Sequence, residues 1–203
     1  MRKRRALGWR QPRACEYSIG VENGFNDEYF STLGLQEKYK QAQEYHDKAL
    51  TIFEKIHGEE HSKIATCSDN LGGDYWCLKQ YNQAQKYRKK ALDMRKNIYG
   101  EEHTDVATSY NNLGTEHCSL GQYDQAQEYH EKSLYIRIKI YGEEHAVVAT
   151  SYFMLGNDHW GLGQCGQAKE YFEKALSIRK KIYGEEHAEV AKSYNTLRNL
   201  ETA

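Results

Sequence analysis

The sequence predicts an all-α solenoid, a stack of helical hairpins, from three observations. The tetrapeptide Gly-Glu-Glu-His recurs at residues 58–61, 100–103, 142–145 and 184–187, always 42 residues apart. Small and apolar residues keep the same phase: Ala42, Ala84, Ala126 and Ala168; Ala65, Ala107, Ala149 and Ala191; Leu71, Leu113, Leu155 and Leu197. Between the markers, apolar residues recur at spacings of three or four, which is typical of amphipathic helices. A fixed period of this length indicates a repeat array in which each unit packs against its neighbours.

Each unit contains two predicted helices. The first, helix A, carries one apolar face, formed in the middle unit by Val106, Tyr110, Leu113 and His117. Leu120-Gly121-Gln122 ends it. The second, helix B, carries two apolar stripes: Ala126, Tyr129, Ser133, Ile136 and Ile140 on one side, and Tyr123, His130, Leu134, Ile138 and Tyr141 on the other. A helix with two such stripes has two neighbours, its own helix A and the helix A of the next unit.

The recurring tetrapeptide is interpreted as the turn between units. Its glycine can adopt the left-handed conformation that ends helix B, and its glutamates then lie near the positive N-terminus of the next helix A. The histidines could be metal ligands only if they converged on one ion. Stacked helices lie about 8 to 10 Å apart, whereas zinc requires each nitrogen within about 2.1 Å. We therefore expect the histidines to serve in capping or turn packing.

Composition narrows the function further. Hydrophobic residues make up 39% of the 203 residues and the mean hydropathy is −0.91, which suits thin amphipathic layers. The net charge is −1, but residues 1–13 hold six basic residues and no acid, so the remainder has 22 bases against 29 acids. An acidic body disfavours nucleic-acid binding. No apolar run reaches 18 residues, so we expect no membrane insertion. The basic start lacks a secretory pattern, and the predicted localisation is cytoplasmic.

Cysteines and catalytic motifs give no sign of an enzyme. The five cysteines, at positions 15, 67, 77, 118 and 165, include no Cys-x-x-Cys pair. They are interpreted as small buried or half-buried thiols in a reducing compartment, not as metal or redox sites. The sequence contains no nucleophile elbow, phosphate-binding glycine loop or His-Glu-x-x-His motif. We expect no catalytic residue, no cofactor and no metal.

The residues within one unit resemble a known family. The pattern Leu71-Gly72, Tyr81, Ala84, Tyr87 and Ala91-Leu92 is similar to the tetratricopeptide repeat, in the 42-residue form of kinesin light chain and nephrocystin-3-like proteins. The resemblance covers about residues 20–200 and implies a right-handed superhelix. It implies the following units: a basic, disordered segment at 1–19, a degenerate first repeat at 20–62, repeats at 63–104, 105–146 and 147–188, and a terminal helix A or capping helix at 189–203. The family usually has proline after the marker histidine, where this chain has Ser62, Thr104, Ala146 and Ala188.

Both ends of the array depart from the pattern. Val21, Phe25, Tyr29 and Leu33 keep helical spacing but lack the Leu-Gly pair in register, which indicates a degenerate or truncated helix A. Gly72, Gly114 and Gly156 lie in the middle of helix A, where glycine costs about 0.5 to 1 kcal/mol, so helix B must approach closely there. The last unit has Arg198 instead. Residues 189–200 therefore form a terminal cap, or the chain is a fragment of a longer array. Residues 1–13 are a solvated end, or else a nuclear signal or polybasic contact.

The predicted binding site lies on the face of helix A that points away from the core. In the middle unit this face is polar but uncharged, unlike the Lys- and Glu-rich surface of helix B. It resembles the concave, ligand-lining surface of the family. Its candidate residues are Asp69, Asn70, Trp76, Thr108, Asn111, Asn112, Phe153, Met154, Asn157, Trp160, Lys192 and Asn195. Asn side chains can both donate to and accept from the backbone of an extended peptide, and the aromatic residues and Met154 would form apolar pockets. The alternatives are that both tryptophans belong to the inter-helix core and that the asparagines only fill the helix surface.

These observations predict a non-catalytic scaffold or adaptor that binds a protein or extended peptide of unknown identity, as a cargo adaptor does. Binding of a chaperone tail is disfavoured because Lys192 is the one basic residue on the predicted face. No sustained heptads precede residue 40, so engagement of a motor chain cannot be inferred. The alternative function is a regulatory or oligomerisation module of a larger protein with an effector domain elsewhere. Self-association through an exposed terminal repeat is a further hypothesis.

Overall fold

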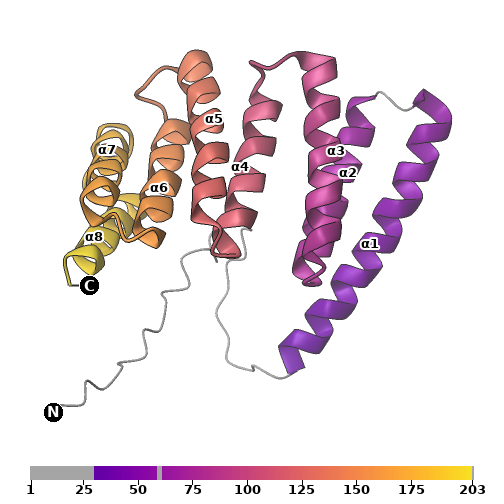
Figure 1. The fold of residues 1–203 in the computed structure, drawn as a ribbon, viewed down its shortest axis with the longest axis horizontal. Helices are drawn as coiled ribbons and strands as arrows, with labels where there is room; N and C mark the ends of the chain where they lie inside the picture. Colours follow the sequence, from indigo (N-terminus) through magenta and orange to yellow (C-terminus); the bar gives the residue numbers. More distant parts are fainter. Residues whose placement is uncertain (1–29, 59–60, 203) are drawn as a thin grey trace, which may run out of the picture.

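The computed structural model describes residues 30–58 and 61–202, which form eight helices and no strand. The helices are α1 (Phe30–His57), α2 (Ser62–Cys77), α3 (Tyr81–Tyr99), α4 (Thr104–Ser119), α5 (Tyr123–Tyr141), α6 (Ala146–Gly161), α7 (Cys165–Tyr183) and α8 (Ala188–Glu201). Consecutive helices pack side by side and run in alternating directions along the molecule (Figure 1). The predicted all-α solenoid is confirmed.

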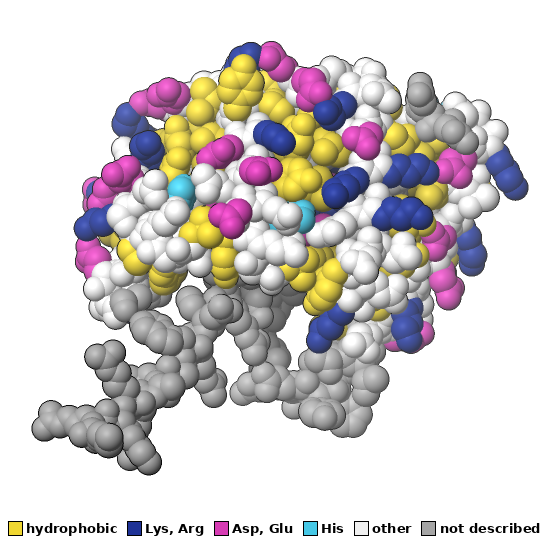
Figure 2. Space-filling model, viewed as in Figure 1, with side chains coloured by type: hydrophobic (Ala, Val, Ile, Leu, Met, Phe, Trp, Pro, Cys, Tyr) yellow, Lys and Arg dark blue, Asp and Glu magenta, His cyan; other side chains and the backbone are white. Residues whose placement is uncertain are grey.

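The core is divided into thin layers between successive helices. The leucine of each full helix A, at positions 71, 113 and 155, is completely buried, and so are the alanines at 65, 107 and 149. One cluster joins Leu92 of α3 with Val106 of α4 and Ile136 of α5, so each helix B packs on the helix A before and after it. Basic, acidic and apolar side chains are interspersed over the face of the molecule shown in Figure 2. No helix in the described part of the chain is long and apolar enough to span a bilayer.

Tight turns end each helix A through one residue with a positive φ. This residue is Lys79 (φ 61°), Gly121 (φ 74°) or Gly163 (φ 74°). The corresponding position in the first unit is Glu37, and α1 continues through it as a single helix. Of the residues predicted to form a degenerate first helix A, Leu33 lies in α1, whereas Val21, Phe25 and Tyr29 lie outside the described residues, as does the basic segment at 1–19.

The turn between units behaves as its sequence predicts. Gly100, Gly142 and Gly184 end helix B with φ values of 82°, 77° and 79°. The marker histidines cap the next helix: in each, Nδ1 accepts the backbone N–H two residues later, at 3.1 to 3.3 Å. Three of the four also stack on the last tyrosine of helix B, at ring distances of 4.2 to 4.6 Å. The capping interpretation is confirmed. The glutamates pair with helix B lysines, as in Lys96 with Glu101 at 2.7 Å.

The mid-helix glycines allow the predicted close approach of helix B. A Cβ on Gly72 would lie 2.6 Å from Arg88, on Gly114 2.6 Å from His130, and on Gly156 2.5 Å from Phe172. Side chains at these positions would collide with the facing helix. Arg198 holds the same position in α8 and is exposed, with no following helix in the described part of the chain.

Candidate functional site

The predicted binding face is formed by α2, α4, α6 and α8, and we call it the inner face. The outer face is the exposed side of α1, α3, α5 and α7. Because α4 contacts α6 directly, the inner-face residues of successive units are neighbours. Asn70 and Thr108 are exposed, and Asn111, Asn112 and Met154 are half-buried. These five residues form an uncharged band along three helices.

The aromatic candidates are largely engaged in packing. Trp160 meets Phe172 edge-on at 6.3 Å, and Phe153 packs on the same ring at 5.2 Å. Both belong to the margin of a buried cluster with Leu200. Trp76 lies against Tyr81 at 4.8 Å. These contacts resemble inter-helix core packing, although all three rings retain some exposed surface.

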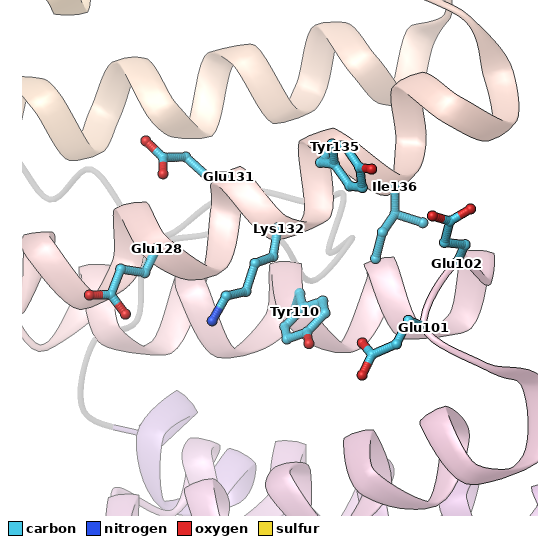
Figure 3. Close-up of a pocket in the computed structure, with 8 residues that line it drawn as sticks. All are labelled: Glu101, Glu102, Tyr110, Glu128, Glu131, Lys132, Tyr135 and Ile136. Carbon is cyan, nitrogen blue, oxygen red and sulfur yellow. The ribbon is translucent and has the colours of Figure 1, made fainter.

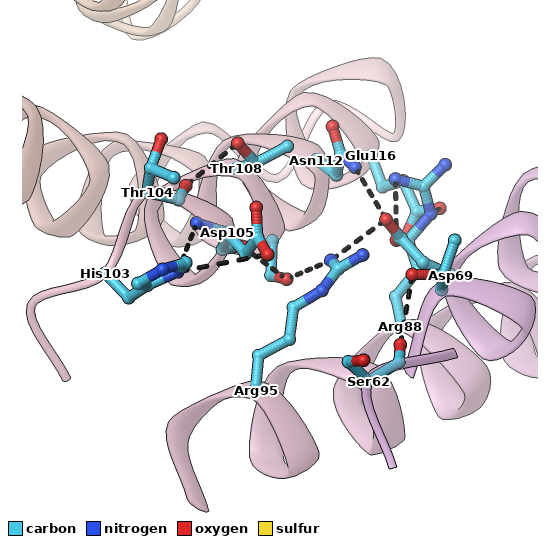
Figure 4. Close-up of polar contacts among 12 residues, drawn as sticks. Ser62, Asp69, Arg88, Arg95, His103, Thr104, Asp105, Thr108, Asn112 and Glu116 are labelled. Atoms are coloured by element: carbon cyan, nitrogen blue, oxygen red, sulfur yellow. Dashed lines mark hydrogen bonds and ion pairs between the residues drawn. The ribbon is translucent and has the colours of Figure 1, made fainter. Parts of the chain in front are cut away.

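The remaining candidates lie at different depths. Asp69 is half-buried and Asn157 is buried, whereas Lys192 and Asn195 of α8 are exposed. Lys192 donates to Glu189 at 2.6 Å. Asp69 accepts from Asn112 Nδ2 at 3.5 Å across the α2 and α4 layers (Figure 4).

A row of arginines beneath the inner face was missed by sequence reasoning. Arg95, Arg137 and Arg179 are 42 residues apart on successive B helices. Each reaches the helix A of its own unit and donates to a serine on the next helix A, at 2.6 to 2.7 Å. Arg95 also donates to Asp69 at 3.0 Å, as Figure 4 shows. The signal was the repeated arginine itself, which lay between the two apolar stripes.

The middle arginine lacks a carboxylate partner. Arg179 has Glu189 at 3.5 Å and lies 4.8 Å from the centre of the Phe153 ring. Arg137 donates instead to neutral oxygens: Asn111 Oδ1 at 3.3 Å, Ser151 Oγ at 2.7 Å and the Val147 carbonyl at 3.5 Å. It forms no ion pair with any described residue. Burial lowers the pKa of its guanidinium.

A second row of buried pairs joins each helix B to the next helix A. The pairs are His46 with Asp74 at 2.6 Å, Arg88 with Glu116 at 2.7 Å, and His130 with Asp158 at 2.5 Å. In the next layer the same positions hold Phe172 and Leu200. Burial raises the pKa of Glu116 to about 7, although Arg88 opposes this shift. Burial also raises the pKa of Asp158, against the opposing effect of His130. These pairs fasten layers together, and neither row forms a catalytic arrangement.

Two hollows lie away from the inner face. One, of about 620 Å³, lies beside α5 and includes Tyr110, Glu128, Glu131 and Tyr135 (Figure 3). The other, of about 610 Å³, lies beside α3 and includes Lys86, Lys89 and Met94. None of the predicted site residues lines either hollow.

Comparison with known families gives one match, repeated along the chain. A family model described as the tetratricopeptide repeat matches residues 31–97, 67–134 and 105–181. A search of curated protein sequences finds no match.

Solved structures with the same arrangement include several repeat proteins. BtubC (BKLC) from P. vanneervenii is 27% identical, with a TM-score of 0.68 over 80% of this chain and 68% of that chain. A Podosopora anserina protein with nearly identical TPR-like repeats, named as a kinesin light chain, is 21% identical, with a TM-score of 0.72 over 85% and 82%. The N-terminal domain of stress-induced protein-1 from C. elegans is 16% identical, with a TM-score of 0.53 over 69% and 96%. The last two show similarity of fold.

Proposed function

Because the chain belongs to the tetratricopeptide repeat family, whose repeats generally mediate protein–protein interaction, we propose that it is a non-catalytic adaptor whose inner face binds an extended peptide. The supporting observation is the uncharged band of Asn70, Thr108, Asn111, Asn112 and Met154, which keeps exposed hydrogen-bonding groups on three adjacent helices. An extended peptide presents backbone groups at regular intervals, and Asn side chains can donate to and accept from them.

The contacts of the band also indicate which residues would bind and which would only support. Asn70 has no recorded hydrogen bond to a described residue, so its carboxamide is available to a ligand. Asn112 makes one long contact to Asp69, at 3.5 Å, which a peptide could replace. Trp160 is a poor test residue because its removal would open the packing around Phe172.

The proposal is tested by selecting peptides from a random display library on the full chain and measuring their affinity for variants. The Asn70→Ala/Asn112→Ala variant should bind selected peptides at least about tenfold more weakly, since losing hydrogen bonds worth about 1.4 kcal/mol has this effect. Asn82→Ala/Asn97→Ala on α3 of the outer face is the matched control and should bind normally. Circular dichroism checks that both variants are folded. Equal affinity of all three proteins would reject the inner face as the site.

A further inference from the structure

The outward positions of the B helices change sign from one helix to the next. Two of these positions, 42 residues apart, hold Lys86 and Lys89 in α3 but Glu128 and Glu131 in α5. All four side chains are exposed, and none forms an ion pair with a described residue. The two helices are neighbours, because Leu92 of α3 and Ile136 of α5 share one buried cluster. A basic stripe and an acidic stripe therefore run side by side on the outer face.

The hollows beside these stripes suit insertion of side chains from a partner. The hollow beside α5 has Tyr110 and Ile136 buried at its floor, Tyr135 on its wall and Glu128 and Glu131 at its rim (Figure 3). Tyr135 is 58% exposed, which leaves a large apolar ring uncovered. Lysine suits such a site, because its aliphatic stem packs on apolar surface while its ammonium group stays near carboxylates.

We propose that a second copy of this chain covers this surface, in a two-fold dimer formed by α3 and α5 of each copy. A two-fold axis parallel to these helices and midway between them brings α3 of one copy onto α5 of the other at the same height. Because positions 86 and 128 are equivalent in the repeat, Lys86 then faces Glu128 of the partner subunit, and Lys89 faces Glu131 of the partner subunit. The contact occurs twice, as a two-fold interface requires.

The other outward positions fit the same arrangement. Asp93 in α3 is equivalent to Tyr135 in α5, so a carboxylate faces a tyrosine hydroxyl, and Asn82 is likewise equivalent to Asp124. Pairing α3 with α3, or α5 with α5, would instead place like charges together. Glu44 and Asp47 hold the two positions in α1, but Asp47 is half-buried, so α5 offers the more exposed acidic pair. Apolar contact with Tyr135 supplies affinity and the charges fix the register. The inner face stays open.

The test is sedimentation velocity of the full chain at about 0.05 and 0.5 M NaCl, where screening lengths differ about threefold. The chain should be dimeric at low salt and should dissociate at high salt. Lys86→Glu/Lys89→Glu and Glu128→Lys/Glu131→Lys should each weaken dimerisation about 100-fold, because each double reversal makes four attractive pairs repulsive. Glu170→Lys/Glu173→Lys, at the same positions of α7, is the matched control and should leave the dimer intact.

Mixing the two reversed variants gives the decisive result. One variant is acidic on both helices and the other is basic on both, so a mixture should form a heterodimer as stable as the original dimer. A monomeric wild-type chain would overturn the proposal, and so would a dimer that tolerates both reversals or a mixture that stays monomeric. Loss of the dimer in Glu44→Lys/Asp47→Lys instead would assign the contact to α1 and overturn it. If the chain is monomeric and a synthetic peptide of residues 1–13 binds in a Glu128-dependent way, the hollow takes a basic peptide and not a second copy.

Discussion

At position 111, an asparagine stands where the preceding unit has Asp69. Asp69 gives Arg95 a charged partner, whereas Arg137 has only the neutral Asn111 oxygen at 3.3 Å. Asn111→Asp should therefore raise the free energy of unfolding by about 1 kcal/mol, because hydrogen bonds between charged groups are stronger than neutral ones. Urea denaturation at pH 7 measures the change. Asp69→Asn, the reverse change in the first layer, should lower stability. A less stable Asn111→Asp protein would show that desolvating the new carboxylate outweighs its attraction to Arg137.

The buried carboxyl of Glu116 should make stability depend on pH. Its pKa rises from 4.5 to about 7 on folding, chiefly through burial, so the fold favours the protonated form. The stability it contributes is complete below pH 4.5 and is lost as the pH rises through about 7, by up to about 3 kcal/mol. Glu116→Gln cannot ionise and should escape this loss. The measurement is the difference in unfolding free energy between the two proteins from pH 4 to 8. Parallel curves would show that Glu116 does not titrate in this range.

At the scale of the helix, adjacent glycine positions test close approach against helix propensity. Replacing glycine by alanine normally stabilises a helix by about 0.5 to 1 kcal/mol. Gly73→Ala should show this gain, since its nearest neighbour, on Arg88, is 3.6 Å from the new Cβ. Gly114→Ala should instead lose about 1 to 3 kcal/mol, because its Cβ would lie 2.6 Å from the His130 ring. Thermal unfolding of both variants decides. Stabilisation of both would mean that His130 moves freely and that the packing of α4 on α5 is loose.

Features of a single helix or turn were predictable from the sequence, because they depend on local spacing. The cap at His103 and the turn at Gly100 follow from the repeated tetrapeptide, and Leu113 follows from helical periodicity. The continuation of α1 was not predicted, although Glu37 in place of a turn glycine carried the signal.

Contacts between helices were harder to predict. Arg95 and Asp69 are 26 residues apart, and His130 and Asp158 are 28 apart. Such pairs depend on the offset between stacked helices, which one sequence does not specify. The same offset decides that Trp160 meets Phe172, whereas Asn70 stays exposed. The exposed asparagine band of the candidate site was therefore predictable from the helix face, but the packing of its aromatic residues was not.

For the molecule as a whole, stability is the sum of the units and of the interfaces between them. The buried pair His130 and Asp158 forms part of the interface between α5 and α6, and the next interface has Phe172 and Leu200 at the same positions. A buried ion pair is often no more stabilising than apolar residues of similar size. The double variant His130→Phe/Asp158→Leu, which copies the next layer, should thus be at least as stable as the natural chain, by up to about 4 kcal/mol.

Asp158→Leu alone should be less stable by about 3 kcal/mol, since it leaves His130 buried without its acid. The strengthened interface should also make the array unfold in one step, because a weak central interface allows the two halves to unfold separately. Calorimetry measures both effects, through the midpoint temperature and the ratio of van't Hoff to calorimetric enthalpy. A double variant no more stable than Asp158→Leu would show that the layers need the His130–Asp158 pair itself, and that the Phe172 layer depends on a helix spacing the central layers do not share.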